Sequence, residues 1–151
     1  MMRLVSSLIL LSSSALADVQ TAYDNLNTKF SECSTVQPIN GNMRDKWLES
    51  QSEPVIKTML LTLKHRAFQL CVAEADKEYL YQAFLVYINT GNREPLDLYL
   101  SLRENDLLKS QKQIIDSEFI ENADRLAKLS VFSVNFDTLQ AYEEFKEQTN
   151  R

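Results

Sequence analysis

The side chains best suited to chemistry in this 151-residue chain are two cysteines, Cys33 and Cys71. An even number of cysteines in an exported protein favours a disulfide, and this bond would close a loop of about 38 residues. Such a crosslink contributes roughly 4 kcal/mol by restricting the unfolded chain. The alternative is a pair of buried free thiols, since Cys71 lies on an apolar helical stripe. A redox-active pair is disfavoured because the chain lacks a Cys-x-x-Cys motif.

The chain has few other residues that could act in catalysis or bind a metal ion. His65 is the single histidine, it lies between Lys64 and Arg66, and no recognised nucleophile motif accompanies it. Zinc prefers cysteine and histidine ligands, so one histidine and a bonded cysteine pair predict no metal site. The chain also lacks a haem-attachment motif and a glycine-rich phosphate loop. We therefore expect no cofactor and no enzymatic activity.

Tyrosines near the middle of the chain offer a different kind of site, a surface for a protein partner. Tyrosine and arginine are enriched among the residues that dominate binding energy at interfaces. The simpler interpretation, which the frequency of aromatic core stripes favours, is that these rings pack inside with their hydroxyls at the rim. The partner-binding candidates are Tyr79, Tyr81, Tyr87, Arg93 and Tyr99. An acidic helix near the C-terminus, with Glu143, Glu144 and Glu147, is the second choice.

These residues depend for their positions on the stretch from Pro54 to Gly91, which we expect to be the central helical element. One stripe of apolar residues contains Ile56, Met59, Leu60, Leu63, Ala67, Leu70 and Cys71 at helical spacing. A second stripe on another side contains Leu61, Phe68 and Val72. A helix that is apolar on two sides is usually central. The charged residues at 74–78 leave two possibilities, and we favour two helices, or one bent helix, over a straight one.

The flanking sequence predicts an all-α bundle of about five to seven helices. Two glycines and three prolines are few, since ordinary usage would give about 10 and 7. Apolar periodicity predicts helices at 18–32, 95–104, 106–129 and 138–148, with a short helix around Met43 and Trp47. Asp137 is expected to cap the last helix, and Glu121–Arg125 and Asp124–Lys128 are expected as i,i+4 ion pairs. Residues 130–136 alternate like a strand, but without a partner they are expected to be an extended connector that fills the core. The predicted core residues are Tyr23, Leu26, Phe30, Ile56, Leu60, Leu63, Ala67, Leu70, Phe84, Ile88, Leu100, Ile115, Phe119 and Leu126.

The first 17 residues have the features of a secretory signal peptide. Arg3 provides the positive region, an apolar run from Leu4 to Leu11 follows, and Ala15-Leu16-Ala17 is a small-x-small cleavage site. We expect residues 1–17 to be removed and residues 18–151 to form one helical domain, located in the periplasm or secreted. The apolar run is shorter than the roughly 20 residues that span a bilayer. No membrane insertion is expected after cleavage.

Charge narrows the partners that such an exported domain can have. The chain carries 16 basic and 21 acidic residues, and loss of Arg3 with the leader changes the net charge from −5 to −6. An acidic surface disfavours nucleic acid and anionic membranes and is compatible with a basic protein partner.

The predicted build is similar, at the level of general architecture, to periplasmic inhibitors and immunity proteins that block cell-wall or secreted enzymes. This similarity makes a protein-binding domain, an inhibitor or an immunity protein, our expected function. The alternatives are an exported hydrolase with a carboxylate-based site and a structural or chaperone-like periplasmic factor. Two convergent carboxylates in a deep pocket would favour the hydrolase, whereas exposed aromatic residues on a convex acidic surface would favour the binding protein. The oligomeric state is left open.

Overall fold

The computed structural model describes residues 7–103 and 114–150, and it confirms the all-α prediction. Six α-helices and one 3₁₀ turn lie within these ranges, and β-structure there amounts to a single bridge between Gln37 and Phe136. In chain order the helices are α1 (Ser7–Ser34), α2 (Lys46–Ser50), α3 (Glu53–Thr90), α4 (Glu94–Arg103), α6 (Ser117–Leu126) and α7 (Thr138–Thr149), with the turn η1 (Ser130–Phe132) before α7. Of the helix expected at 106–129, residues 106–113 lie outside the described part of the chain, and α6 covers only Ser117–Leu126, so the prediction is wrong at 114–116 and 127–129.

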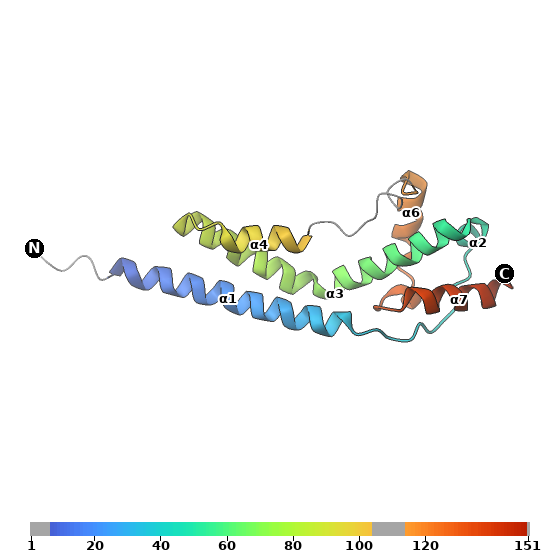
Figure 1. The fold of residues 1–151 in the computed structure, drawn as a ribbon, viewed down its shortest axis with the longest axis horizontal. Helices are drawn as coiled ribbons and strands as arrows, with labels where there is room; N and C mark the ends of the chain where they lie inside the picture. Colours follow the sequence, from blue (N-terminus) through green and yellow to red (C-terminus); the bar gives the residue numbers. More distant parts are fainter. Residues whose placement is uncertain (1–6, 104–113, 151) are drawn as a thin grey trace, which may run out of the picture. The chain divides into compact units, whose positions relative to one another are not determined.

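The helices form two compact units, each with its own hydrophobic cluster (Figure 1). Unit 1 contains α1 up to Glu32, the C-terminal half of α3 from Val72, and α4. Unit 2 contains residues 33–71, with α2 and the N-terminal half of α3, and the chain from 106 onward, with α6 and α7. Helices α1 and α3 therefore contribute residues to both units.

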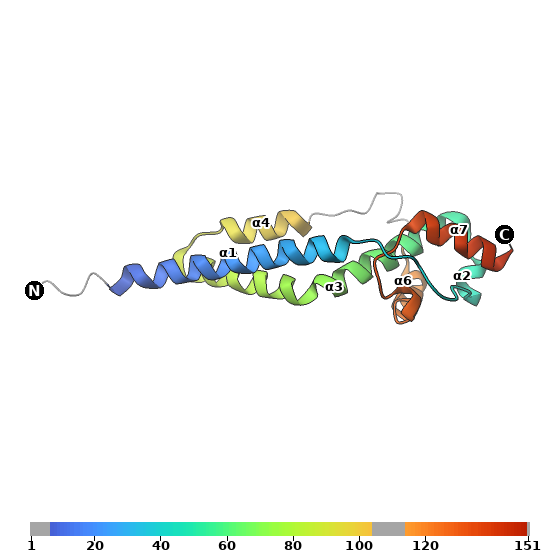
Figure 2. The ribbon, with the colours of Figure 1, turned by 90° about the horizontal axis from the view of Figure 1, so that it is seen from below.

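Unit 1 is a small bundle in which α1, α4 and the C-terminal half of α3 run alongside one another (Figures 1 and 2). Its buried residues are Val19, Ala22 and Leu26 from α1 and Tyr79, Ala83 and Val86 from α3. Tyr23, Phe30, Ala75 and Tyr99 pack partly buried against them. The apolar face predicted for the first helix is therefore confirmed. Two alanines among the six buried residues of this hydrophobic cluster give it a small volume.

Unit 2 has the larger core, built from segments that are far apart in the sequence. Its buried aromatic residues are Phe119, Phe132, Phe136, Tyr142 and Phe145, and they pack with Ile56, Met59, Leu60 and Leu63 of α3. The connector at 130–136 places Val131, Phe132 and Phe136 inside this core, as predicted, but it is not extended throughout, because Ser130–Phe132 form the turn η1. Its backbone bridge to Gln37 and the Asn135 Nδ2 hydrogen bond to the Ser34 carbonyl, 2.8 Å, fix its position.

Aspartates begin three of the helices in unit 2. The side chain of Asp45 accepts hydrogen bonds from the N–H groups of Trp47 and Leu48, Asp116 accepts from Phe119, and Asp137 accepts from Leu139 and Gln140. Such caps satisfy N–H groups that have no partner within the helix. The predicted Asp137 cap is confirmed, and its carboxyl pKa lies below its usual value because it accepts backbone hydrogen bonds.

Helix α3 runs from Glu53 to Thr90 as one helix, so the predicted alternative of two separate helices is wrong. The charged residues at 74–78 suit a helix, and Lys77 pairs with Glu74 at 2.7 Å on its surface. The predicted C-terminal stop is confirmed, because Gly91 has a φ of +75° and its N–H bonds to the Tyr87 carbonyl at 2.8 Å.

Four of the predicted core residues are wrong, and all of them lie on α3 or α4. Leu70, Phe84, Ile88 and Leu100 expose 71, 46, 60 and 48% of their surface. The C-terminal half of α3 is apolar around most of its circumference, and its neighbours cover the side that carries Tyr79, Ala83 and Val86. Tyr23, Phe30 and Ile115 are partly buried, and the remaining predicted core residues are buried.

Candidate protein-binding surface

Five large apolar residues form an exposed strip on the C-terminal half of α3. We call this strip the outer face, and it consists of Leu80, Tyr81, Phe84, Tyr87 and Ile88, each 36–60% exposed. Steps of three and four residues place them together on one side of the helix. That side differs from the one on which Tyr79, Ala83 and Val86 pack into the core of unit 1. The outer face is therefore a second apolar surface that unit 1 does not use for its own packing.

The outer face is also free of charge over an unusual length. A quarter of the chain is Asp, Glu, Lys or Arg, yet residues 79–92 contain none of these. The charged side chains nearest in sequence are Glu78, which accepts a hydrogen bond from Gln82, and Arg93 at the other end. Exposed apolar area bordered by polar residues is typical of sites that bind other proteins.

Two of the five residues predicted to bind a partner are inside unit 1 instead. Tyr79 is 1% exposed, and its hydroxyl donates a 3.0 Å hydrogen bond to the Pro95 carbonyl of α4. Burial, together with the neighbouring Tyr23, raises the pKa of the Tyr79 hydroxyl. Tyr99 is partly buried and donates to Asp76. These two rings join α3 to α4, and their centroids are 6.2 Å apart. They position the hairpin, and Tyr79 has almost no exposed surface to offer a partner.

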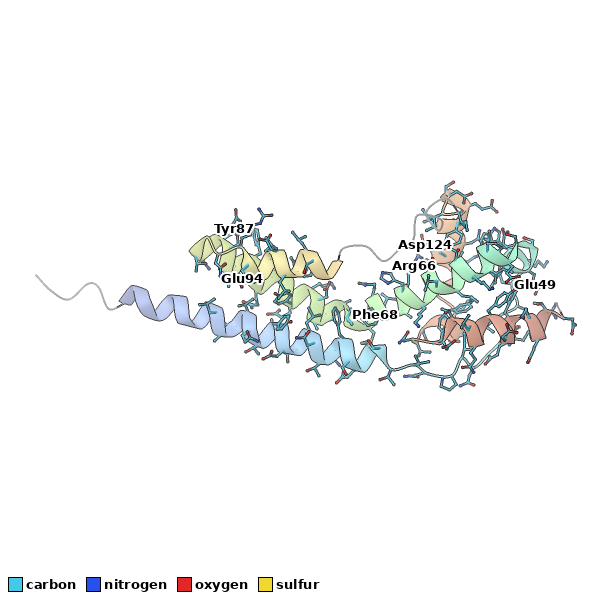
Figure 3. The ribbon with its side chains drawn as sticks, in the orientation of Figure 1. Glu49, Arg66, Phe68, Tyr87, Glu94 and Asp124 are labelled. Carbon is cyan, nitrogen blue, oxygen red and sulfur yellow. A yellow bond between two sulfur atoms is a disulfide. The ribbon has the colours of Figure 1, made fainter. Side chains whose placement is uncertain are left out.

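Tyr81, Tyr87 and Arg93, the other three predicted residues, remain on the surface. Figure 3 shows Tyr87 near the end of α3, in the same part of unit 1 as Glu94 at the start of α4. Arg93 pairs with Asp97 at 2.8 Å, one turn into α4. The structure thus brings Tyr81 and Tyr87 onto the outer face, with Arg93 at the tip of the hairpin beyond it.

Leu80, Phe84 and Ile88 are the outer-face residues that the sequence analysis did not propose for binding. Phe84 and Ile88 were assigned to the core because they are large and apolar at helical spacing. The sequence does contain a second apolar stripe on this helix, Tyr79, Ala83 and Val86, at the same helical spacing. This stripe indicates that Phe84 and Ile88 need not be the buried residues. A helix with two apolar stripes can bury one of them and present the other.

The predicted disulfide between Cys33 and Cys71 is present, with the Cα atoms 5.9 Å apart. Cys33 is buried and Cys71 is exposed, so the two ends of the bond differ in access to solvent. These cysteines are also the first and last residues of the first segment of unit 2. The bond closes that segment into a covalent ring.

Two clefts among the described residues could hold a substrate, and a carboxylate-based hydrolase would need two carboxylates in one of them. The cleft in unit 1, about 390 Å³, contains one carboxylate, Glu94, together with Tyr23, Tyr79 and polar groups of α1. The cleft in unit 2, about 290 Å³, also contains one, Glu53. Most glycoside hydrolases need two carboxylates on opposite sides of the scissile bond. Neither cleft supplies such a pair.

The charges around the cleft of unit 2 neutralise one another. Lys57 lies 4.7 Å and Lys146 lies 5.0 Å from the centre of the Tyr142 ring. Lys57 pairs with Glu53, and Lys146 pairs with Glu143 at 2.6 Å. Each lysine has a raised pKa, chiefly because it donates a hydrogen bond to its glutamate. The site is a packed cation–π arrangement with internal ion pairs and no surplus charge for a ligand.

The histidine, the possible metal ligands and the acidic helix considered in the sequence analysis do not form a common site. His65 is exposed on α3, and within the described residues no group of three or more His, Cys, Asp or Glu side chains is placed to hold a metal ion. In the second-choice acidic helix, Glu143 pairs with Lys146, Glu144 accepts a hydrogen bond from Gln140, and Glu147 is exposed. This leaves the outer face as the best candidate for a functional surface.

Comparisons with known proteins do not assign the chain to a class. No known protein family matches it, and searches of characterised proteins and of solved structures find no significant match. Among the helices of the described residues, none combines the length and apolar character needed to cross a bilayer.

Proposed function

We propose that this chain is an exported protein-binding domain whose outer face on α3 contacts the partner. The observation that carries the proposal is the position of Tyr81, Phe84 and Tyr87, three aromatic rings exposed on a rigid helix rather than buried beneath it. Rigid aromatic side chains provide contact area at a low cost in conformational entropy. Arg93 at the hairpin tip adds a planar group that can form paired hydrogen bonds with a partner.

Export is part of the proposal and rests on the leader at residues 1–17 together with the disulfide. Disulfides persist in oxidising compartments such as the periplasm and are rare in the cytosol. In such a compartment a small acidic helical domain with an exposed apolar face suits an inhibitor or immunity protein of a secreted or cell-wall enzyme. The net charge of −5 to −6 favours a basic partner.

The test is affinity capture from the exported fraction of the source cells with the disulfide-bonded protein as bait. Tyr81→Ala is the principal variant, and Leu139→Ala is the matched control, because Leu139 is an apolar residue of unit 2 that is 72% exposed. Loss of an interface hot spot weakens binding by at least about 30-fold, which corresponds to about 2 kcal/mol. We expect a specific protein to be retained by the wild type and by Leu139→Ala but not by Tyr81→Ala.

Salt provides an independent criterion for the partner. If the captured protein is basic, its association with this acidic domain should slow as salt rises from about 50 to 500 mM. Equal capture by the wild type, Tyr81→Ala, Tyr87→Ala and Arg93→Ala would place the binding surface elsewhere. The acidic helix with Glu143, Glu144 and Glu147 would then be tested next.

A further inference from the structure

We infer that the outer face of α3 also binds a second copy of this chain, in an antiparallel helix pair related by a two-fold axis at Phe84. The inference rests on the proposed function in one respect, that the outer face binds protein. It names the occupant of that face when no other partner is present.

The residue types of the outer face are symmetric about Phe84. Leu80 and Ile88 lie four residues before and after it, and Tyr81 and Tyr87 lie three residues before and after it. Any helical face repeats at such steps, so the positions alone do not distinguish a second copy from another partner. The residue types favour a second copy, because their order along the face is aliphatic, tyrosine, phenylalanine, tyrosine, aliphatic in both directions.

A two-fold axis perpendicular to a helix places each residue level with its mirror position in the other copy. With the axis at Phe84, the two Phe84 rings meet, Leu80 is level with Ile88 of the second copy, and Tyr81 is level with its Tyr87. Each level of the face then brings together residues of matching character. Helices that pack in this way cross at about 20° and use knobs at the same spacing.

The charges at the ends of the face permit this pairing. At one end Lys77 is neutralised by Glu74, and at the other Arg93 is neutralised by Asp97. The antiparallel arrangement brings the first end of one copy near the second end of the other, so each of these ion pairs lies near the other kind, with Glu78 and Glu94 as further charges at the two ends. Between these ends, residues 79–92 carry no charge at all.

The area of the face sets the expected strength. An aromatic side chain buries roughly 150–250 Å², so three half-exposed rings and two aliphatic residues offer on the order of 500 Å² per copy. The pair would bury about 1,000 Å² in total, at the lower limit of specific interfaces. We therefore expect a dimer that dissociates in the micromolar range and leaves the face accessible to a tighter partner.

Sedimentation of the purified, disulfide-bonded protein between about 1 and 200 μM tests the association. The wild type should show a concentration-dependent doubling of mass. Phe84→Glu should weaken dimerisation by at least about 30-fold, because it places two carboxylates against each other at the axis. Leu139→Glu, on the exposed surface of α7, is the matched control and should dimerise like the wild type. Phe84→Glu should fold normally because Phe84 lies outside both cores.

Crosslinking tests the geometry. Under mild oxidation Phe84→Cys should form a covalent dimer while the Cys33–Cys71 bond, checked by peptide mapping, stays intact. Lys77→Cys should not, because in the antiparallel pair the two copies of residue 77 are about 21 Å apart along the helices. Equal crosslinking at both positions would overturn the antiparallel arrangement.

Salt separates this inference from the proposed function. Two copies of an acidic protein repel one another, so the dimer should tighten as salt rises from about 50 to 500 mM, whereas binding to a basic partner should weaken. A wild type that remains monomeric at about 200 μM in both salt concentrations overturns the dimer, since a micromolar interface would be occupied there. Such a monomer can still capture a basic partner, which would leave the proposed function standing.

Discussion

Units 1 and 2 use their large apolar residues in opposite ways. Unit 2 buries four phenylalanines, Phe119, Phe132, Phe136 and Phe145, in one core. Unit 1 fills much of its core with alanine and valine and leaves Phe84 and two tyrosines on its surface. The ion pairs of the two units also differ in their separation along the sequence. Arg125 of unit 2 bonds to Asp45, 80 residues away, while Arg93 of unit 1 pairs with Asp97, four residues away.

The difference suggests a division of roles within a small chain. Long-range contacts and large buried side chains stabilise unit 2, which is what a structural core requires. In unit 1, small residues at the helix contacts let the helices pack with little volume, and the large side chains remain for recognition. The apolar surface of unit 1 is therefore where binding should be sought, and unit 2 is where substitutions should most affect folding.

The largest expected effect comes from a matched pair of phenylalanine substitutions. Phe145→Ala, at a side chain that is 0% exposed in unit 2, should lower the free energy of unfolding by about 3–5 kcal/mol. Phe84→Ala, at the half-exposed ring of the outer face, should change it by about 1 kcal/mol or less. Urea unfolding of both variants measures the two values. A similar loss in the free energy of unfolding for both variants would contradict the proposed division of roles between the units.

A smaller effect is expected from the disulfide, which closes the first segment of unit 2. Replacing both Cys33 and Cys71 by serine should lower the free energy of unfolding by about 2–4 kcal/mol, because the unfolded chain regains the freedom of a 38-residue loop. Unfolding of the wild type with and without reductant gives an independent value. A double variant as stable as the oxidised wild type would show that packing alone holds the segment.

The smallest effect concerns Asp45 and depends on pH. Hydrogen bonds from Arg125 are the main reason that the pKa of the Asp45 carboxyl lies below its usual value of 3.8. A lowered folded-state pKa contributes stability that is complete above the unfolded pKa and disappears as the pH falls through the folded pKa. Asp45→Asn, which keeps a capping side chain, should cost about 1 kcal/mol at pH 7, since Arg125 is half exposed.

The same substitution should flatten the loss of stability below about pH 4, measured by urea unfolding across pH. Asp97→Asn in unit 1 is the control, because its partner Arg93 lies one turn away on an exposed surface. It should change stability by at most about 0.5 kcal/mol. Equal effects of the two substitutions would mean that long-range ion pairs are no more important to unit 2 than local ones are to unit 1.

Local patterns predicted the helical class, several helix ends and the disulfide from the sequence, but not the start of α1 at Ser7 or the bounds of α6. Gly91 and Asp137 marked a helix end and a helix start because their roles depend on neighbouring residues only. The choice between the two apolar stripes of α3 depends on where α1 and α4 lie, and for this reason Phe84 was placed in the core. The ion pairs of α6 were equally hard to predict, since helical spacing suggested partners for Asp124 and Arg125 along the same helix.

In the structure Arg125 bonds to Asp45 at 2.7 and 2.9 Å, and Asp124 pairs with Arg66, which faces it in Figure 3. Partners so distant in sequence leave no periodic signal. Tyr81 and Tyr87 are exposed, so the favoured interpretation that they pack in the core is wrong, and their contact with a partner stays a prediction.

The ring closed by Cys33 and Cys71 also determines how the protein responds to proteolysis. The segment after α1 is exposed at Thr35 and Val36, just before the backbone bridge of Gln37, and exposed loops are preferred sites of cleavage. A single cut there adds one water to the mass but releases no fragment, because the disulfide still joins the two pieces. The nicked molecule remains one covalent species until a reductant opens the bond, so unit 2 can lose chain continuity at this loop without losing a segment.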